Sequence, residues 1–383
     1  MNIPYGKQSI DRTDLEAVER VLTSDFMTQG PEIARFEEAF NQRMGAPYSI
    51  AVSNGTAALH LAVLALGLKP NQRVITSPIT FAASANCVAY AGGVAEFCDI
   101  DPATYLIDLQ KLEEMLKVKP HGYYAGIIPV DFGGLSVNLE RVRALADQYG
   151  CWVLEDACHA PGATFTDSKG NQITAGDCTY SDAAIFSFHP VKHIACGEGG
   201  MITTSSKEVN QSLQVLRTHG ITKDSNLMTE NHGGWYYEMI ELGYNYRLTD
   251  MQAALGLTQL AKLDWSLEQR NRIARKYDEL FKKLGWPHQL TPGGCFHAYH
   301  LYVIQHPKRK ELYDYLREHG VFAQVHYIPV HLLPYYQDLG WKKGDCPNAE
   351  RYYDQCLSLP MYPTLTDEEF NYVSNLLISF DKQ

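Results

Sequence analysis

The sequence predicts an α/β protein with a largely parallel sheet, followed by a smaller α+β domain. Short, continuous apolar runs recur along the first two thirds of the chain, and segments with helical apolar spacing separate them. Beyond a long helical segment at residues 263–285 this alternation stops. We therefore expect an N-terminal segment and large α/β domain over residues 1–258, and a small C-terminal α+β domain over residues 259–383.

The elements of the large domain follow in a regular order. Helical spacing over residues 12–45 is interrupted at 28–31, where Thr-Gln-Gly-Pro favours a break. Further helices are expected over 55–66 and 138–150, where apolar residues recur with helical spacing. Several of the apolar runs are continuous rather than alternating, which is typical of strands covered on both faces. The expected strands are 48–52, 73–77, 94–100, 125–130, 151–155, 183–188 and 201–204.

The small domain is expected to begin with the long helix at 263–285. Three segments follow, "HAYHLYVIQ" (297–305), "RKELYDYLREHG" (309–320) and "FAQVHYIPVH" (322–331). A final helix is expected near 367–380. Strand-like and helix-like segments in this mixed order favour an α+β arrangement.

Composition and charge limit the function. The chain has 383 residues, of which 45% are hydrophobic and 20% charged, as in ordinary globular proteins. A net charge of −11 argues against nucleic acid or an anionic membrane as the main partner. The N-terminus lacks a signal-peptide profile, and no apolar run has transmembrane length. The nine cysteines form no paired framework. We therefore expect a cytoplasmic protein.

The first polar cluster at a strand end is Ser53-Asn54-Gly55-Thr56, between a strand and a helix. Ligands of open α/β sheets bind beyond the carboxyl ends of the strands, and the amides of a helix start suit a phosphate. Glycine at such a turn lets the backbone approach a ligand closely. A helix N-cap by Ser53 or Asn54 explains the same residues without a ligand. The cluster is neither a Walker loop nor a dinucleotide fingerprint.

A second cluster, Glu155, Asp156 and His159, follows another apolar run. Asp156 could meet a cation deep in the cleft, where pairing would keep both groups charged. A carboxylate capping a helix is the alternative. The residues alone leave both interpretations open.

The third cluster, "SFHPVKHIACGEGG" (187–200), contains Ser187 and Lys192. A lysine held in a cleft near other cations can lose its proton and attack carbonyl groups. The alternative is a metal site formed by His189, His193 and Cys196. Their spacing matches none of the usual zinc patterns, so we expect no metal.

A fourth cluster, "ELGYNYRLTDMQAALGLTQL" (241–260), holds Asn245 before a helix of small residues. By itself it indicates no more than a loop and a buried helix. In order along the chain, however, the four clusters resemble the sugar-nucleotide aminotransferases of pyridoxal-phosphate fold type I, the DegT/StrS group. The resemblance extends over nearly the whole chain, and it implies the aspartate-aminotransferase-like fold with pyridoxal 5′-phosphate as cofactor.

The resemblance also implies roles for single residues. Lys192 corresponds to the lysine that holds the cofactor and moves the proton, and Asp156 to the carboxylate that keeps the pyridine nitrogen protonated. Asn245 corresponds to a residue that reaches the phosphate of the neighbouring subunit, so a homodimer with shared active sites is expected. The remaining cofactor contacts are Gly55, Thr56 and Ser187 for the phosphate, Phe81 stacked on the ring, and His159 near the ring substituents.

Further stretches, including "YGKQSID" (5–11), "SDFMTQGP" (24–31) and "HYIPVHLLPYY" (326–336), are similar to the UDP-4-amino-4,6-dideoxy-N-acetyl-β-L-altrosamine transaminases of pseudaminic acid biosynthesis. This similarity implies ping-pong transfer of an amino group from L-glutamate to C4 of a UDP-linked keto sugar. His326 could instead be a simple strand-end histidine. The implied substrate contacts are Tyr5, Asp25, Phe26, Met27, Thr28, Gly55, Ser187, Asn245, His326, Tyr327, Ile328 and Pro329.

Three other functions fit the same fold. A dehydratase of this scaffold would carry a histidine where Lys192 stands, which makes that function a poor match. An aminotransferase for another nucleotide sugar, a UDP-4-keto-D-sugar or a dTDP-keto sugar, is the serious competitor. A non-enzymatic sensor would not need the intact set of lysine, aspartate and phosphate-binding residues.

Overall fold

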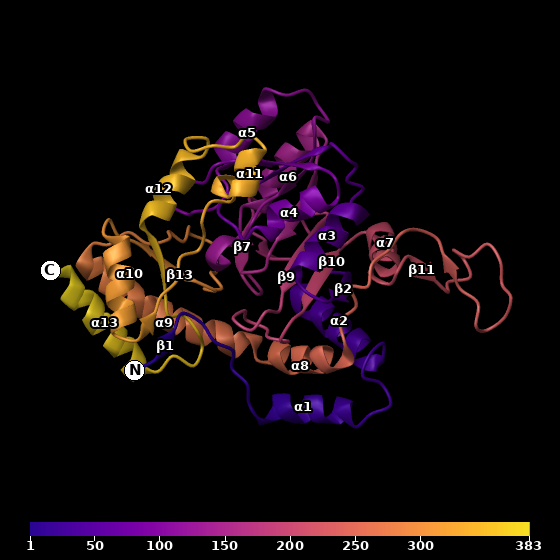
Figure 1. The fold of residues 1–383 in the computed structure, drawn as a ribbon, viewed down its shortest axis with the longest axis horizontal. Coiled ribbons are helices and arrows are strands. Elements are labelled where there is room, and N and C mark those ends of the chain that lie inside the picture. Colours follow the sequence, from indigo (N-terminus) through magenta and orange to yellow (C-terminus); the bar gives the residue numbers. More distant parts are fainter. Residues whose placement is uncertain (383) are drawn as a thin grey trace.

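A seven-stranded sheet forms the centre of the computed structural model, which describes residues 1–382 (Figure 1). Its strand order is β2-β10-β9-β6-β5-β3-β4, and β10 alone runs antiparallel to its two neighbours. Each apolar run expected as a strand contributes one, so the expected α/β class is confirmed. The bounds are β2 Tyr48–Val52, β3 Arg73–Thr76, β4 Val94–Phe97, β5 Tyr124–Ile128, β6 Trp152–Asp156, β9 Ala183–Ser187 and β10 Gly200–Thr204.

Helices cover both faces of this sheet. Along β9, Ile185 belongs to one apolar cluster and Phe186 to another, because successive side chains point to opposite faces. The Ile185 face packs under α3 (Gly55–Ala65) and the Phe186 face under α2 (Pro31–Met44). The other helices of this part are α4 Ala83–Tyr90, α5 Leu109–Lys117, α6 Leu139–Tyr149, α7 Lys207–Arg217 and α8 Asp250–Ala261.

The helical segment expected over 12–45 consists of two helices, α1 (Arg12–Leu22) and α2. The interruption between them is longer than the expected 28–31. Gly30 N–H donates to Asp250 Oδ2 at 2.8 Å, and a Cβ on Gly30 would lie 2.7 Å from Asp250 Oδ1. This contact with the start of α8 turns the chain, and α1 lies alongside α8 on its lower side in the view of Figure 1.

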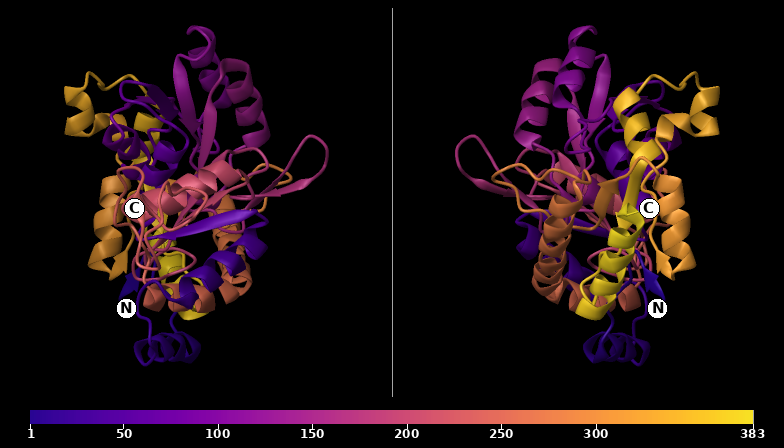
Figure 2. Two further views of the ribbon diagram at one scale, coloured as in Figure 1. Left: turned by 90° about the vertical axis from the view of Figure 1, so that its right-hand side faces the viewer. Right: turned by 90° about the vertical axis from the view of Figure 1, so that its left-hand side faces the viewer.

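The C-terminal part packs around a second apolar cluster that includes Tyr277 and Phe281 of α9 (Leu263–Leu284). Ile3 of β1 (Ile3–Pro4) joins this cluster, and β1 pairs with β14 (Val321–Phe322), so both chain ends lie at this end of the molecule (Figures 1 and 2). The division at residues 258 and 259 stays a prediction. The remaining elements are β13 Tyr302–Gln305, α10 Arg309–Glu318, α11 Pro334–Asp338, α12 Pro347–Gln355, β15 Cys356–Leu359 and α13 Asp367–Asp381.

Two hairpins were not expected from the sequence. One joins β7 (Thr164–Thr166) to β8 (Gln172–Thr174). The other joins β11 (Ile221–Thr222) to β12 (Glu238–Met239) and extends away from the sheet (Figure 1). We call residues 221–242 the arm. Among residues 1–382, no helix is long and apolar enough to cross a membrane.

Candidate active site

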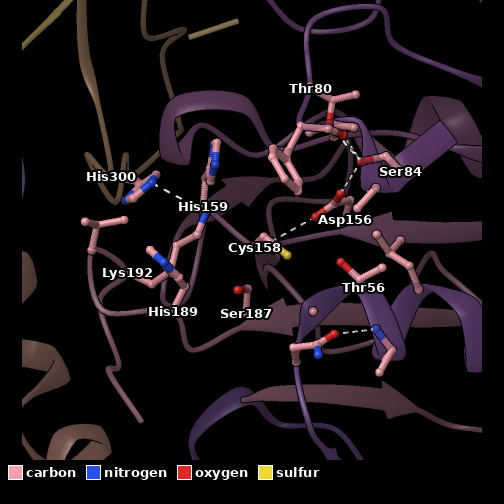
Figure 3. Close-up of a pocket in the computed structure, with 18 of the residues that line it drawn as sticks. Thr56, Thr80, Ser84, Asp156, Cys158, His159, Ser187, His189, Lys192 and His300 are labelled. Atoms are coloured by element: carbon pink, nitrogen blue, oxygen red, sulfur yellow. Dashed lines mark hydrogen bonds between the residues drawn. The ribbon is translucent and has the colours of Figure 1, made fainter. Parts of the chain in front are cut away.

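A cavity of about 680 Å³ opens where the parallel strands end (Figure 3). Its size is typical of a small-molecule site. Most of the residues expected to bind cofactor or substrate line it, together with residues of the C-terminal part. The predicted residues in the lining are Tyr5, Gly55, Thr56, Phe81, Asp156, His159, Ser187, Lys192, His326 and Tyr327.

The turn between β2 and α3 forms one wall. Asn54 caps α3 by accepting a hydrogen bond from Ala57 N–H at 2.8 Å, so the N-cap interpretation holds for its side chain. Gly55 lies against β9, because a Cβ here would approach Ser187 Cβ to 2.9 Å. The first amides of α3 therefore face the cavity beside Thr56 and Ser187, an arrangement that suits a phosphate.

Asp156 lies at the end of β6 with its carboxylate buried. Ser84 Oγ donates to Oδ2 at 2.7 Å, and Cys158 N–H donates to Oδ1 at 3.2 Å. Thr80 Oγ1 lies 2.7 Å from Ser84 Oγ (Figure 3). Both oxygens of the Asp156 carboxylate accept hydrogen bonds from uncharged donors. These donors orient the carboxylate but do not neutralise its negative charge, which therefore acts on the cavity. A cation bound in the cavity would meet this charge.

Lys192 enters the cavity from the loop after β9. Its Nζ lies 3.5 Å from His300 Nε2. Removal from water lowers the pKa of Lys192, while Cys158 and Asp156 act in the opposite direction. A desolvated lysine with a lowered pKa supplies the free amine that carbonyl chemistry requires.

His159 faces the same space from the loop after β6. Its Nδ1 accepts a hydrogen bond from Gly133 N–H at 3.2 Å, which leaves the proton on Nε2, 3.3 Å from Tyr327 Oη. Burial lowers the pKa of His159 well below its usual value, so the imidazole is neutral. Its ring centroid lies 4.3 Å from that of His300.

The three residues of the alternative metal site lie in different surroundings. His189 lines the cavity, whereas His193 donates from Nε2 to the carbonyl of Ala298 at 2.8 Å. Cys196 is buried in the apolar cluster with Phe36. Over residues 1–382 no group of three or more potential ligands is arranged to hold a metal ion.

Several predicted substrate and cofactor residues do not reach the cavity of their own chain. Asn245 is exposed beside the base of the arm, where its backbone pairs with Thr218. Residues 25–28 are exposed between α1 and α2, and Thr28 pairs with Thr249. Ile328 and Pro329 follow the two cavity residues His326 and Tyr327 but lie outside the lining. Their roles stay predictions.

The sequence analysis did not predict two side chains that contact Asp156 and Lys192. Ser84 donates a hydrogen bond to Asp156. It lies three residues after Phe81, and a hydroxyl so close in sequence to an expected site residue could have indicated a role in the site. His300 contacts Lys192 although 107 residues separate the two along the chain. Only the folded chain brings them together.

These features define an α/β enzyme in which a lysine amine acts beside a buried carboxylate. The chain belongs to the DegT/DnrJ/EryC1/StrS aminotransferase family, whose model matches residues 8–377. It is therefore a sugar aminotransferase that depends on pyridoxal phosphate, as the resemblance implied.

Named relatives cover almost the whole chain. The spore coat polysaccharide biosynthesis protein SpsC of Bacillus subtilis is 38% identical, over 96% of this chain and 94% of its own. The UDP-4-amino-4,6-dideoxy-N-acetyl-β-L-altrosamine transaminase of Campylobacter jejuni (serotype O:23/36) is 36% identical, over 98% and 97%. The solved structure of Helicobacter pylori PseC, an aminotransferase of pseudaminic acid biosynthesis, covers all of both chains with a TM-score of 0.88 and 28% identity.

The cavity fits pyridoxal 5′-phosphate. The PLP-form and PMP-form of the putative sugar aminotransferase Spr1654 of Streptococcus pneumoniae each have a TM-score of 0.90 at 25% identity, over 100% of this chain and 99% of that one. The residues present fit the group: Asp156 would face a ring nitrogen with its negative charge, the α3 start would face a phosphate with its amides, and Lys192 would face a carbonyl with its amine. Phe81, 63% exposed, lies at the cavity with its ring available for stacking.

Proposed function

We propose that this enzyme transfers an amino group from L-glutamate to C4 of a UDP-2-acetamido-2,6-dideoxy-4-keto-hexose. The product would be UDP-4-amino-4,6-dideoxy-N-acetyl-β-L-altrosamine. The observation that carries this proposal is the 36% identity, over nearly all of both chains, to a transaminase of that name. The cavity, with Tyr5 and His326 in its lining, supports a substrate larger than an amino acid.

The proposed reaction divides the work between two side chains. When bound, pyridoxal phosphate stores the amino group between two half-reactions and accepts the electron pair left when a C–H bond breaks. Lys192 Nζ, as a free amine, takes a proton from the α-carbon of glutamate and supplies one to C4 of the sugar. The carboxylate of Asp156 would face the ring nitrogen and keep it protonated, which would strengthen the electron withdrawal that the ring supplies. Glutamate leaves as 2-oxoglutarate before the keto sugar binds, and the oxygen of the sugar leaves as water, so ping-pong kinetics are expected.

Roles for the remaining predicted residues belong to the same proposal. Thr56 and Ser187 would bind the cofactor phosphate with the amide of Gly55. His159, neutral and held by Gly133, would lie against the ring substituents. The predicted contacts of Tyr327 with substrate are supported by its position in the cavity wall.

We also propose a homodimer with shared active sites. Asn245 and residues 25–28 are exposed in a single chain, which suits residues that serve a partner's cavity. The arm exposes a group of large apolar side chains that a second copy would cover. They are Leu227, Trp235, Tyr237, Met239, Ile240 and Leu242.

All nine cysteines are unpaired, which supports the expected cytoplasmic location.

A second candidate is the same reaction on another nucleotide-linked keto sugar. The observation that favours it is the 38% identity to the spore coat protein SpsC, which exceeds the identity to the altrosamine transaminase. The two candidates share the lysine, the carboxylate and the cofactor. They differ only in the sugar that the cavity accepts.

The test is an amination assay with L-glutamate and a panel of nucleotide sugars. The panel contains UDP-linked 4-keto sugars of both C5 configurations and a dTDP-linked 4-keto sugar, and mass spectrometry follows the exchange of oxygen for an amino group. We expect the highest kcat/KM for the UDP-linked β-L-arabino sugar. A higher value for another sugar would establish the second candidate, and no amination of any keto sugar would contradict both.

A further inference from the structure

His300 meets Lys192 from the C-terminal part of the chain. Its Nε2 lies 3.5 Å from Lys192 Nζ, and both residues line the cavity (Figure 3). It belongs to the segment just before β13, whereas Lys192 belongs to the loop after β9. The contact therefore joins two parts of the fold at the amine on which the reaction depends.

The backbone around His300 is held from two sides. Arg270 Nη1 donates to the carbonyl of Tyr299 at 2.9 Å and is itself buried. Ala298 N–H donates to the carbonyl of Gly134 at 2.8 Å. A Cβ on Gly134 would lie 3.0 Å from His300 N, so the loop after β5 packs directly against this segment. The imidazole thus occupies a position that the fold specifies closely.

The hydrogen-bond partners of His300 indicate where its proton lies. Its Nδ1 is buried and has no partner among residues 1–382. A buried N–H without an acceptor is rarer in proteins than an acceptor without a donor, so the proton belongs on Nε2. Nε2–H then points at Lys192 Nζ. That nitrogen can accept a hydrogen bond only as a free amine.

The surroundings keep His300 neutral. Burial is the largest cause that lowers its pKa well below the usual value, and the charge of Arg270 acts in the same direction, as would any charge on Lys192, His159 or His193. Lys192 in turn faces Asp156 and Cys158, which favour its charged form, so a donor aimed at Nζ opposes them.

We propose that His300 is a positioning residue for Lys192: its Nε2–H donates to the lone pair of Nζ and holds the lysine as a free amine directed into the cavity. Once Lys192 has taken a proton, the same N–H faces an ammonium group, and this repulsion favours passing the proton on. The inference rests on the role proposed for Lys192. It concerns no sugar and no amino donor.

The test measures the pKa of Lys192 in the full chain loaded with pyridoxamine 5′-phosphate, which forms no bond to the lysine. Competitive acetylation over a range of pH, resolved by peptide mass spectrometry, reports Lys192 separately from other lysines. In His300→Leu we expect the pKa of Lys192 to rise by about one unit, the size of one lost hydrogen bond. His300→Asn, which keeps a donor, should restore part of the shift and allows the measurement if the leucine variant fails to fold.

His297→Gln is the matched control. His297 is equally buried on the same segment, but its Nδ1 accepts from Tyr299 N–H and its ring does not contact Lys192. Its removal should lower the thermal stability without moving the pKa of Lys192. An unchanged pKa in both His300 variants, or a lower one, would overturn the inference. Because labelling needs neither substrate, this failure is distinct from failure of the proposed function, which the amination assay reports.

Discussion

The inner end of the cavity, around Asp156 and Lys192, differs from the arm at the edge of the molecule. The side chains of the inner end find their partners within one chain, and those of the arm do not. At the inner end, both oxygens of Asp156 have donors and Lys192 has a partner in His300. In the arm, Trp235 and Leu242 expose 76% and 77% of their surface. One region is complete within the chain, and the other presents the kind of surface that proteins cover by association.

The difference separates two questions about this enzyme. Cofactor chemistry should depend on the strand ends of one chain, where donors and charges are already arranged. Assembly, and with it any residue supplied across the interface, should depend on the arm and on exposed residues such as Asn245. Variants in the two regions should therefore fail in different ways.

The largest effect is expected at the inner end. Asp156→Asn keeps the shape, and its amide oxygen can accept from Ser84, but it removes the negative charge proposed to face the ring nitrogen. We expect kcat/KM to fall by on the order of 10²–10³-fold, as for other losses of a charge or donor at a reacting group. Steady-state kinetics with L-glutamate check this, and a native-sized particle on gel filtration confirms that assembly is intact.

Ser84→Ala sharpens the same prediction. It leaves the charge of Asp156 and removes one donor at 2.7 Å, so the loss should be about tenfold. Equal losses in the two variants would mean that the geometry of Asp156 matters and its charge does not.

A smaller effect is expected in the arm. Trp235→Ser combined with Leu242→Ser removes apolar surface that association would bury, so the self-association constant should fall by at least about tenfold. Activity at low protein concentration should fall with it and recover at high concentration. Analytical ultracentrifugation and concentration-dependent assays measure both.

Val118→Ser is the control for the arm, because Val118 is 77% exposed just after α5 and lies outside the arm. It should change neither assembly nor activity. If the arm variant remains a dimer of full activity, the arm is not the interface, and its exposed apolar side chains have no role in association.

The smallest effect concerns two carboxyl groups beneath the inner end. Asp131 and Glu155 are fully buried, and each has a carboxyl oxygen without a hydrogen-bond partner among residues 1–382. Burial raises the pKa of Asp131 to about 7 and that of Glu155 well above its usual value. The folded protein therefore binds more protons here than the unfolded chain above about pH 4. Stability is present at low pH and is lost as the pH rises toward 7.

Asp131→Asn should remove part of that dependence. Between pH 5 and 7 the free energy of unfolding should decrease with pH less steeply in the variant, by up to about 1 kcal/mol per pH unit. Urea unfolding at a series of pH values measures the slope. Parallel slopes in the wild type and the variant would show that the pair shares no extra proton.

Local pattern predicted much of this fold because continuous apolar runs between helical segments suffice to indicate a covered sheet. It could not predict that β10 runs antiparallel, since an apolar run carries no direction. The break around Gly30 is longer than expected because it depends on a contact with Asp250, 220 residues away. The two strands of the arm, β11 and β12, are only two residues long, which is too short for an alternating pattern to indicate a strand pair.

For the site, the sequence indicated the residues at the strand ends, since topology alone brings Gly55, Asp156 and Ser187 to one edge of the sheet. The partners that orient them were harder to predict. Ser84 and His300 act through contacts between distant segments. The nearness of Ser84 to Phe81 in the sequence was one signal, but nothing in the sequence points to His300.

Identifying the lysine that carries the cofactor would test the proposed reaction at its first step. Protein incubated with pyridoxal phosphate is reduced with sodium borohydride, digested and analysed by peptide mass spectrometry, with and without prior L-glutamate. We predict a reduced cofactor adduct on Lys192 alone, its loss after glutamate, and none in Lys192→Ala. An adduct on another lysine, or bound cofactor that leaves Lys192 unmodified, would contradict the role proposed for Lys192.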